Sequence, residues 1–320
     1  MQDQKAYEAG LGLFCGVVAY LIWGGLFPVY FKALGGVPLL QVVSHRIVWS
    51  LVFLMFLNCG RWEGVHRALG GRSLPILATT ALLIAANWLL FIYAILAGQI
   101  LQASLGYFMT PLANVLLGRI FLHEKLNRLQ LLSLLMAAAG VLVSVVRYGS
   151  VPWISLVLAL SFACYGLLRK VVKADALAGL TVETALLAPF ACGYMVFAAW
   201  RGEGVFFVFG METYVLLMMA GVLTAVPLLL FAAAARRLRL TTLGFLQYLA
   251  PSLQFCLAIF VFDEACSEVL LASFSLIWSS LFFYSWDAWR SLIPSRLKFS
   301  ELPSRTVRPS PTRIGCSVSK

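Results

Sequence analysis

Three ionisable side chains lie inside long apolar stretches of the sequence, where charged residues are unusual. His45 and Arg46 are neighbours in VVSHRIVWS, and Glu183 lies in LTVETALL. An ionisable group within a membrane is costly and commonly marks the path of a substrate or an ion. We therefore expect Arg46 to bind an anionic group or to act at a gate, and Glu183 to bind a proton or a cation. The structural alternative is that both side chains snorkel to the nearer membrane interface.

Amide and aromatic side chains within the apolar stretches complete the candidate substrate-binding or gating residues. Interhelical hydrogen bonds would explain the amides without any ligand. Aromatic residues in such stretches often serve packing or interface anchoring instead. The additional candidates are Trp23, Asn87, Tyr93, Asn114, Gln247 and Gln254.

No arrangement of residues predicts enzyme catalysis. His45 is the sole His within an apolar stretch, so a Ser-His-Asp triad has no support. The seven cysteines are scattered without the C-x-x-C spacing of a metal or redox site. The chain also lacks the phosphate-binding loop G-x-x-x-x-G-K-[ST]. We expect no enzyme activity, no cofactor and no metal, so any transport energy would come from a gradient or from exchange.

The composition requires a lipid environment for these residues. Hydrophobic residues make up 62% of the 320 and charged residues only 12%, with a mean hydropathy of +0.92. A soluble domain carries roughly 25% charged residues. The net charge of +11 comes from basic residues in short gaps between apolar stretches, with no basic patch of interleaved aromatics, so nucleic acid is not an expected partner.

Ten apolar stretches are each long enough to cross a bilayer as a helix, which takes roughly 20 residues. The sequence thus predicts an all-α integral membrane protein with ten transmembrane helices. The stretches are about 11–31, 39–58, 74–97, 100–122, 129–146, 150–168, 178–199, 213–235, 240–262 and 267–287.

Basic residues orient the predicted helices. One set of loops and the two ends hold 19 Lys and Arg, whereas the other set holds only Lys32, Arg147 and Arg201. Because cytoplasmic loops carry the excess, both termini are expected in the cytoplasm. Residues 1–10 then form a cytoplasmic N-terminus without the positive region of a cleavable signal. Residues 288–320, rich in Ser, Pro and Arg, form a disordered basic cytoplasmic tail.

The two halves of the chain resemble each other. Pro111, Asn114 and Glu124 recur as Pro251, Gln254 and Glu264 at an offset of 140 residues. Each half, 11–146 and 150–287, therefore has five helices. Because five is odd, the second half enters the membrane from the opposite side, and inverted repeats are typical of secondary transporters.

The helix geometry also places the two key charges apart. At 1.5 Å per residue, Arg46 lies ~10 Å below the outer surface and Glu183 ~8 Å above the inner one. They are then ~12 Å apart along a ~30 Å membrane normal. We therefore predict no permanent salt bridge between them.

Several longer stretches carry a family likeness over about residues 8–287. They are AYLIWGGLFPVYFK, SHRIVWS, NWLLFIYA, ASLGYFMTPLANVLLG, LSFACYGLLRK, PLLLFAAAARRL and TLGFLQYLAPSLQF. In these the chain resembles the RarD branch of the EamA, drug/metabolite transporter superfamily. The resemblance implies a ten-helix permease of the bacterial inner membrane, built as two five-helix repeats. The basic, Pro-rich tail departs from that pattern.

We therefore expect a secondary transporter that exports a small metabolite or drug-like molecule by alternating access, with proton coupling through Glu183. The alternative is a membrane-embedded enzyme or a lipid-handling protein that uses the same helical bundle. Transport predicts a polar cavity between the repeats, whereas an enzyme predicts clustered acids, bases or metal ligands on one face. The sequence shows paired amides and no such cluster, which favours transport.

Overall fold

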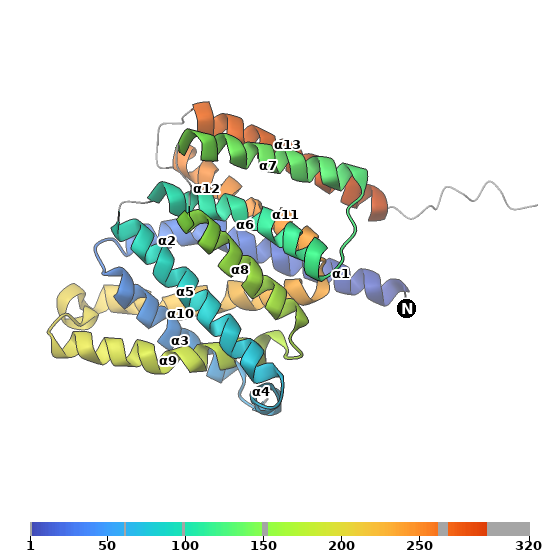
Figure 1. Ribbon diagram of the computed structural model, residues 1–320. Helices are drawn as coiled ribbons and strands as arrows, with labels where there is room; N and C mark the ends of the chain where they lie inside the picture. Colours follow the sequence, from blue (N-terminus) through green and yellow to red (C-terminus); the bar gives the residue numbers. More distant parts are fainter. Residues whose placement is uncertain (1, 61, 98–99, 149–152, 262–267, 293–320) are drawn as a thin grey trace, which may run out of the picture.

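The computed structural model describes residues 2–60, 62–97, 100–148, 153–261 and 268–292. All regular elements of that part of the chain are helices, and most run along one common direction (Figure 1). In chain order they are α1 (Gln2–Leu21), η1 (Ile22–Leu26), α2 (Phe27–Ala33), α3 (Leu39–Leu57), α4 (Trp62–Leu69), α5 (Ser73–Leu96), α6 (Ile100–Phe121), α7 (Arg128–Tyr148), α8 (Trp153–Val171), α9 (Ala176–Trp200), α10 (Val205–Arg237), α11 (Leu240–Gln247), α12 (Leu249–Phe260) and α13 (Glu268–Leu292).

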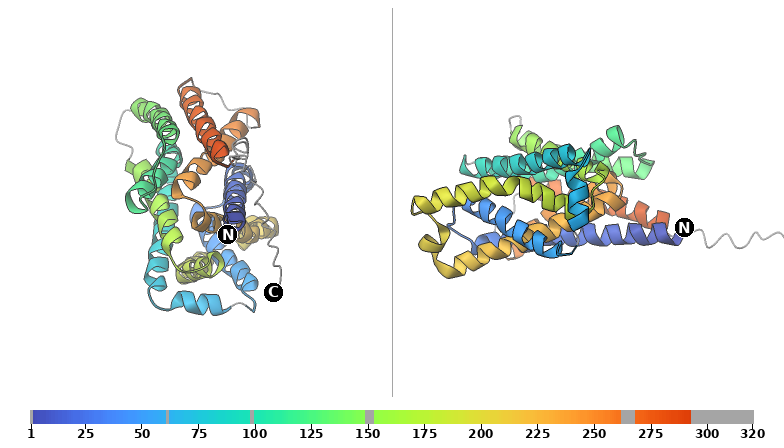
Figure 2. Two further views of the ribbon diagram at one scale, coloured as in Figure 1. Left: turned by 90° about the vertical axis from the view of Figure 1, so that its right-hand side faces the viewer. Right: turned by 90° about the horizontal axis from the view of Figure 1, so that it is seen from below.

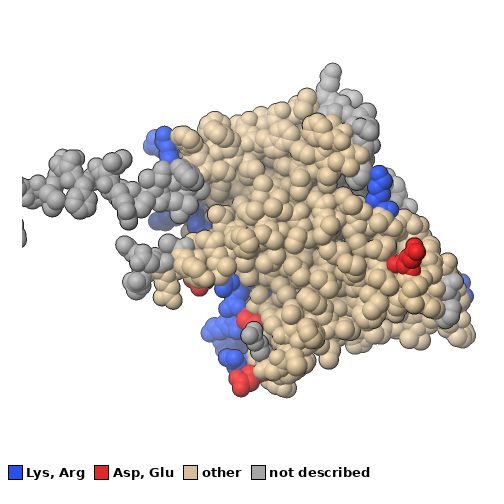
Figure 3. Space-filling view, turned by 180° about the vertical axis from the view of Figure 1, so that it is seen from behind, with Lys and Arg blue, Asp and Glu red and all other residues tan. Residues whose placement is uncertain are grey.

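The prediction of an all-helical membrane protein is confirmed. Six helices are long and apolar enough to cross a membrane, and 105–121 and 128–143 are shorter apolar helices. Each of the ten predicted stretches lies on a helix or on one unit of successive helices, although the count of ten crossings stays a prediction. On the face in Figure 3, Lys and Arg lie at the two ends, with a wide band free of them in between.

Helices from distant parts of the chain pack in pairs. α7 lies beside α13 at one edge of the bundle, at the top of Figure 1 and of the left view in Figure 2. Inside the bundle, α3 packs against both α9 and α10, and α5 packs against α8 and α9. The remaining large contacts are α6 with α8 and α11, and α1 with α10. The last described turn of α13 lies at the same end as the N-terminus (Figure 1).

Two helical units are irregular where the sequence has Gly or Pro. η1 is one π-helical turn between α1 and α2, and a Cβ on its Gly24 would lie 2.7 Å from the carbonyl oxygen of Ala250. Glycine is therefore required for the close approach of η1 to α12. α11 ends and α12 begins around Tyr248, three residues before Pro251. Such irregular turns in membrane helices leave backbone N–H and C=O groups without their usual helical hydrogen bonds, and other residues must bond to them.

Several helices extend beyond the predicted stretches. α8 runs to Val171 rather than ending near 168, because Arg169 is buried inside the bundle. α10 begins at Val205 rather than near 213, with a kink at Gly210, whose φ of 81° suits glycine. α13 continues to Leu292, so residues 288–292 are helical, and the predicted disordered tail from 293 onward lies outside the described residues.

A close contact between α3 and α10 yields a first prediction. A Cβ at Gly221 would lie 2.3 Å from the backbone carbonyl carbon of Trp49, and Ser50 Oγ donates a hydrogen bond to the Gly221 carbonyl at 3.0 Å. Because backbone atoms cannot move aside cheaply, Gly221→Ala should destabilise the protein by about 1–3 kcal/mol. The measurement is thermal unfolding of the purified protein in detergent. The matched control is Gly193→Ala on α9, where a Cβ meets open space. Equal stability of the two variants would contradict the contact.

Candidate functional site

A cavity of about 510 Å³ lies between helices of both halves of the chain. Its walls come from α1, η1, α2 and α3, from α5 and α6, and from α8, α10, α11 and α12. The turn after α2 also lines it, and Gly35 and Gly36 of that turn are exposed, so the cavity reaches the surface at this end of the bundle. Its volume is within the usual range for a small-molecule site, about 300–1,000 Å³.

Five of the nine candidate residues line this cavity. They come from four separate stretches of sequence, which the packing of the helices brings together. They are Trp23, Arg46, Asn87, Gln247 and Gln254.

Among the described residues, Arg46 is the one charged side chain that lines the cavity. Its Nε donates a hydrogen bond to Thr224 Oγ1 at 2.9 Å, which links α3 to α10. The guanidinium carbon lies 4.8 Å from the centre of the Trp88 ring, 5.5 Å from that of Phe27 and 5.7 Å from that of Phe31. Each ring offers a cation–π interaction. Within the described residues, no carboxylate forms an ion pair with Arg46.

The amides play different parts around the cavity. Asn114 does not line it, but is fully buried behind it and donates to Gln247 Oε1 at 2.8 Å. With Oε1 bonded to Asn114, the Gln247 nitrogen donates to no protein acceptor in the described part of the chain. Gln254 Nε2 donates to the Trp23 carbonyl at 3.3 Å, in the π-helical turn. Asn87 Nδ2 donates to Leu158 O at 2.9 Å and to Ser161 Oγ at 2.8 Å, so interhelical bonding occupies its nitrogen.

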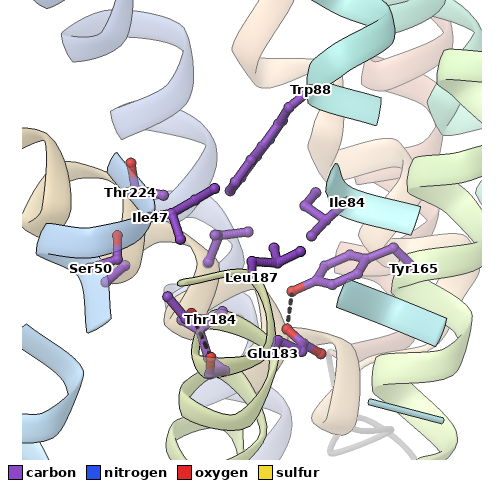
Figure 4. A pocket seen from close by; sticks show the side chains of 12 residues that line it. Ile47, Ser50, Ile84, Trp88, Tyr165, Glu183, Thr184, Leu187 and Thr224 are labelled. Carbon is purple, nitrogen blue, oxygen red and sulfur yellow. Dashed lines mark hydrogen bonds between the residues drawn. The ribbon is translucent and has the colours of Figure 1, made fainter. Parts of the chain in front are cut away.

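Glu183 lies deeper in the bundle, at a second cavity of about 20 Å³. This space shares Ile84, Trp88, Thr224 and Leu228 with the large cavity, so those residues separate Glu183 from it. Figure 4 shows Glu183 and Tyr165 at one end of the small cavity, with Trp88 and Thr224 at the other.

A buried ion pair holds Glu183. Arg169 Nη1 lies 3.3 Å from Glu183 Oε1, and the two side chains are 0% and 2% exposed. Thr80 Oγ1 donates to Oε1 at 2.6 Å, and the Tyr165 hydroxyl donates to Oε2 at 3.4 Å. These contacts join α5, α8 and α9. Glu183 therefore does not snorkel, and within the described residues its ion pair is with Arg169 rather than with Arg46.

Two candidates lie away from the cavity. The His45 ring is buried and meets the Tyr214 ring of α10 edge to face, with centres 5.6 Å apart. Tyr93 is 52% exposed and contacts Trp153 near the end of α5. The structure therefore gives neither residue a place at the cavity, and packing between helices accounts for both.

Sequence reasoning missed the aromatic rings around Arg46 and the partner of Glu183. Phe27, Phe31 and Trp88 carried no signal of their own, because aromatic residues are common in membrane helices. Arg169 was counted with the loop residues, since Lys170 and Lys173 follow it. The stretch LSFACYGLLRK did stand out, and it contains both Arg169 and Tyr165. No group of three or more metal-binding side chains occurs in the described residues.

Comparisons with known proteins agree with these features. Residues 10–146 match the model of the EamA-like transporter family. An "uncharacterized transporter" of Vibrio cholerae is 44% identical over 288 residues, which is 89% of this chain and 94% of that one. The "protein RarD" of Salmonella typhi is 42% identical over 286 residues, or 88% of this chain and 97% of that one.

A solved structure shares the fold as well. It superposes with a TM-score of 0.65 and covers 88% of this chain and 98% of its own, at 18% sequence identity. At that identity the likeness concerns the fold alone.

Proposed function

Because this chain belongs to the EamA-like transporter family, among its RarD members, we propose that it is a secondary transporter that moves a small molecule by alternating access. It is a multi-pass membrane protein of a bacterial transporter family. The proposed site is the cavity around Arg46, with Trp23, Gln247 and Gln254 at its walls.

The observation that carries the proposal is that the cavity reaches the surface at one end of the bundle, whereas a buried ion pair lies toward the other end. At one end the lining reaches the exposed turn at Gly35 and Gly36. Toward the other end, the Arg169–Glu183 pair and its neighbours fill the space between α5, α8 and α9. A transporter needs one closed and one open end, exchanged during the cycle. The buried ion pair is then the closed gate of this state.

The pattern of helix contacts supports two inverted repeats, 11–146 and 150–287. In this arrangement each helical unit of the first repeat has a counterpart in the second. In chain order, α1–α2, α3, α5, α6 and α7 correspond to α8, α9, α10, α11–α12 and α13. If the repeats are equivalent, exchanging every helix for its counterpart should turn each observed contact into another observed contact. The exchange turns the contact of α3 with α10 into that of α9 with α5, and the contact of α1 with α10 into that of α8 with α5. The pairs α3–α9, α6–α11 and α7–α13 map onto themselves. A pseudo-two-fold axis relates transporter repeats in this way.

The distribution of basic residues supports the orientation. The end with the ion pair carries the loops rich in Lys and Arg, which favours a cytoplasmic location for it and for both termini. The cavity then opens to the outside of the bacterial inner membrane. In that arrangement the described state is one that releases an exported molecule.

The test is counterflow in proteoliposomes. Vesicles loaded with one unlabelled small molecule are diluted into a trace of the same labelled molecule, and a panel of metabolites and drug-like compounds is screened. A transporter gives transient uptake of label with at least one compound, and protein-free vesicles give none. Chemical conversion of a compound without counterflow would instead support a membrane enzyme, and no counterflow across the panel would contradict the proposal.

A further inference from the structure

The charge of the cavity lining restricts its ligand. Arg46 contributes one positive charge, and the described residues that line the cavity include no Asp, Glu or Lys. Among these residues, a cationic ligand would meet an uncompensated like charge, and the ammonium group of a zwitterion would find no carboxylate to bind. The buried acid Glu183 lies behind the shared wall and already pairs with Arg169.

The geometry of Arg46 fits an oxyanion. Thr224 accepts a hydrogen bond from Nε of the Arg46 guanidinium. Within the described residues, neither of its two terminal nitrogens donates to a protein acceptor. The terminal nitrogens of a guanidinium can bind two oxygens of a carboxylate or sulfonate side by side. The hydrogen bond to Thr224 and the three rings fix the orientation of the guanidinium, which lowers the entropic cost of binding.

The rest of the lining fits a flat apolar group. Rings of Tyr20, Trp23, Phe31, Trp88, Phe91 and Phe162 contribute to it. Polar groups between them are few, and Gln247 is the amide whose nitrogen is left for a ligand. Apolar walls with a small number of placed polar groups are typical of small-molecule sites.

We propose that the transported substrate is a monoanion with a flat apolar body, bound through its carboxylate or sulfonate by Arg46. This inference rests on the proposed transport function, and it excludes cations and zwitterions as the substrate class. The aromatic walls hold the body while Gln247 donates to the anionic or a neighbouring polar group.

Binding to the purified protein tests this separately from transport. The probes share one body and differ in charge: 4-methylbenzenesulfonate, the neutral 4-methylbenzenesulfonamide and 4-methylbenzylammonium. Quenching of tryptophan fluorescence reports binding, since Trp23 and Trp88 line the cavity. The sulfonate should bind at least tenfold more tightly than the sulfonamide, and the ammonium should not bind. Equal binding of the three probes would overturn the substrate class.

Variants of Arg46 complete the test. Arg46→Lys keeps the charge but loses the planar fork, and should weaken sulfonate binding about tenfold. Arg46→Met should remove the preference for the sulfonate over the sulfonamide. Arg119→Met is the control, because Arg119 is exposed on α6 and does not line the cavity. If Arg46→Met still prefers the sulfonate over the sulfonamide, the proposal is contradicted. If Arg46→Met does not fold, undiminished sulfonate binding by Arg46→Lys contradicts the proposal instead. Counterflow of cations or neutral molecules without anion binding would refute the substrate class and leave the transport function intact.

Discussion

Removing one member of the Arg169–Glu183 pair is expected to destabilise the protein by about 3–5 kcal/mol, whereas removing both should cost far less. Both side chains are almost fully buried, and Arg169 Nε already lacks a hydrogen-bond partner within the described residues. A single substitution leaves the other charge buried without compensation. Replacing both removes that penalty, and Thr80 and Tyr165 can still bond an amide at position 183.

The measurement is a double-mutant cycle on unfolding free energy, with Arg169→Met, Glu183→Gln and the double variant. The control is Arg201→Met, because Arg201 and Glu203 form an ion pair with side chains 56% and 59% exposed. Exposed pairs contribute about 0–1 kcal/mol, so this control should stay close to the parent. Additive effects of the two buried substitutions would show that the charges do not interact.

In proteoliposomes, Glu183→Gln is expected to abolish accumulation driven by a pH gradient while counterflow exchange persists. Opening the inner end of the cavity must separate Glu183 from Arg169, Tyr165 and Thr80, which exposes the carboxyl group to water. A proton that reaches the carboxyl group from the outward-open cavity neutralises it and favours this opening, and its release to the cytoplasm while the inner end is open couples the inward proton gradient to export. Glutamine keeps the shape, and its oxygen can still accept from Thr80, but it cannot titrate. Counterflow needs only binding and rocking, so it survives.

The double variant Arg169→Met/Glu183→Gln separates coupling from stability. Both variants are assayed with the best compound of the counterflow panel, at matched protein levels in the vesicles. If Glu183 serves stability alone, the double variant should regain pH-driven accumulation together with its folding free energy. If Glu183 carries the proton, accumulation stays absent in both variants. Undiminished pH-driven uptake by Glu183→Gln would end the coupling role.

The sequence was informative where a residue conflicts with its surroundings. Arg46 and Glu183 were conspicuous because charge is costly in an apolar stretch. Helix rise alone predicted that the two lie apart, and in the structure each has its own partner. The repeat also singled out Asn114 and Gln254, but not their different bonds: Asn114 meets Gln247, and Gln254 meets a carbonyl in the π-helical turn.

Other features depend on the rotation of each helix, which hydropathy does not specify. Tyr93 was expected at the cavity, yet it lies 52% exposed against Trp153, whereas Trp88, five residues earlier on α5, covers Arg46. Both are aromatic residues in one apolar stretch, and only tertiary packing distinguishes them. Arg169 shows a second limit: a basic residue at the end of a span resembles a topology signal until its buried partner is known.

The single charge in the cavity has an electrical consequence. When the cavity opens outward, Arg46 is at the electrical potential of the outside, and when it opens inward, at that of the cytoplasm. Rocking therefore carries one charge through the membrane potential, although the guanidinium itself hardly moves. At ~100 mV, negative inside, this favours the empty, inward-open form by up to ~2.3 kcal/mol. A bound monoanion cancels the charge of Arg46, so the membrane potential acts only on the step in which the empty carrier returns. Because the potential favours the empty inward-open form, it returns the carrier to the state that binds substrate for export, and it opposes import.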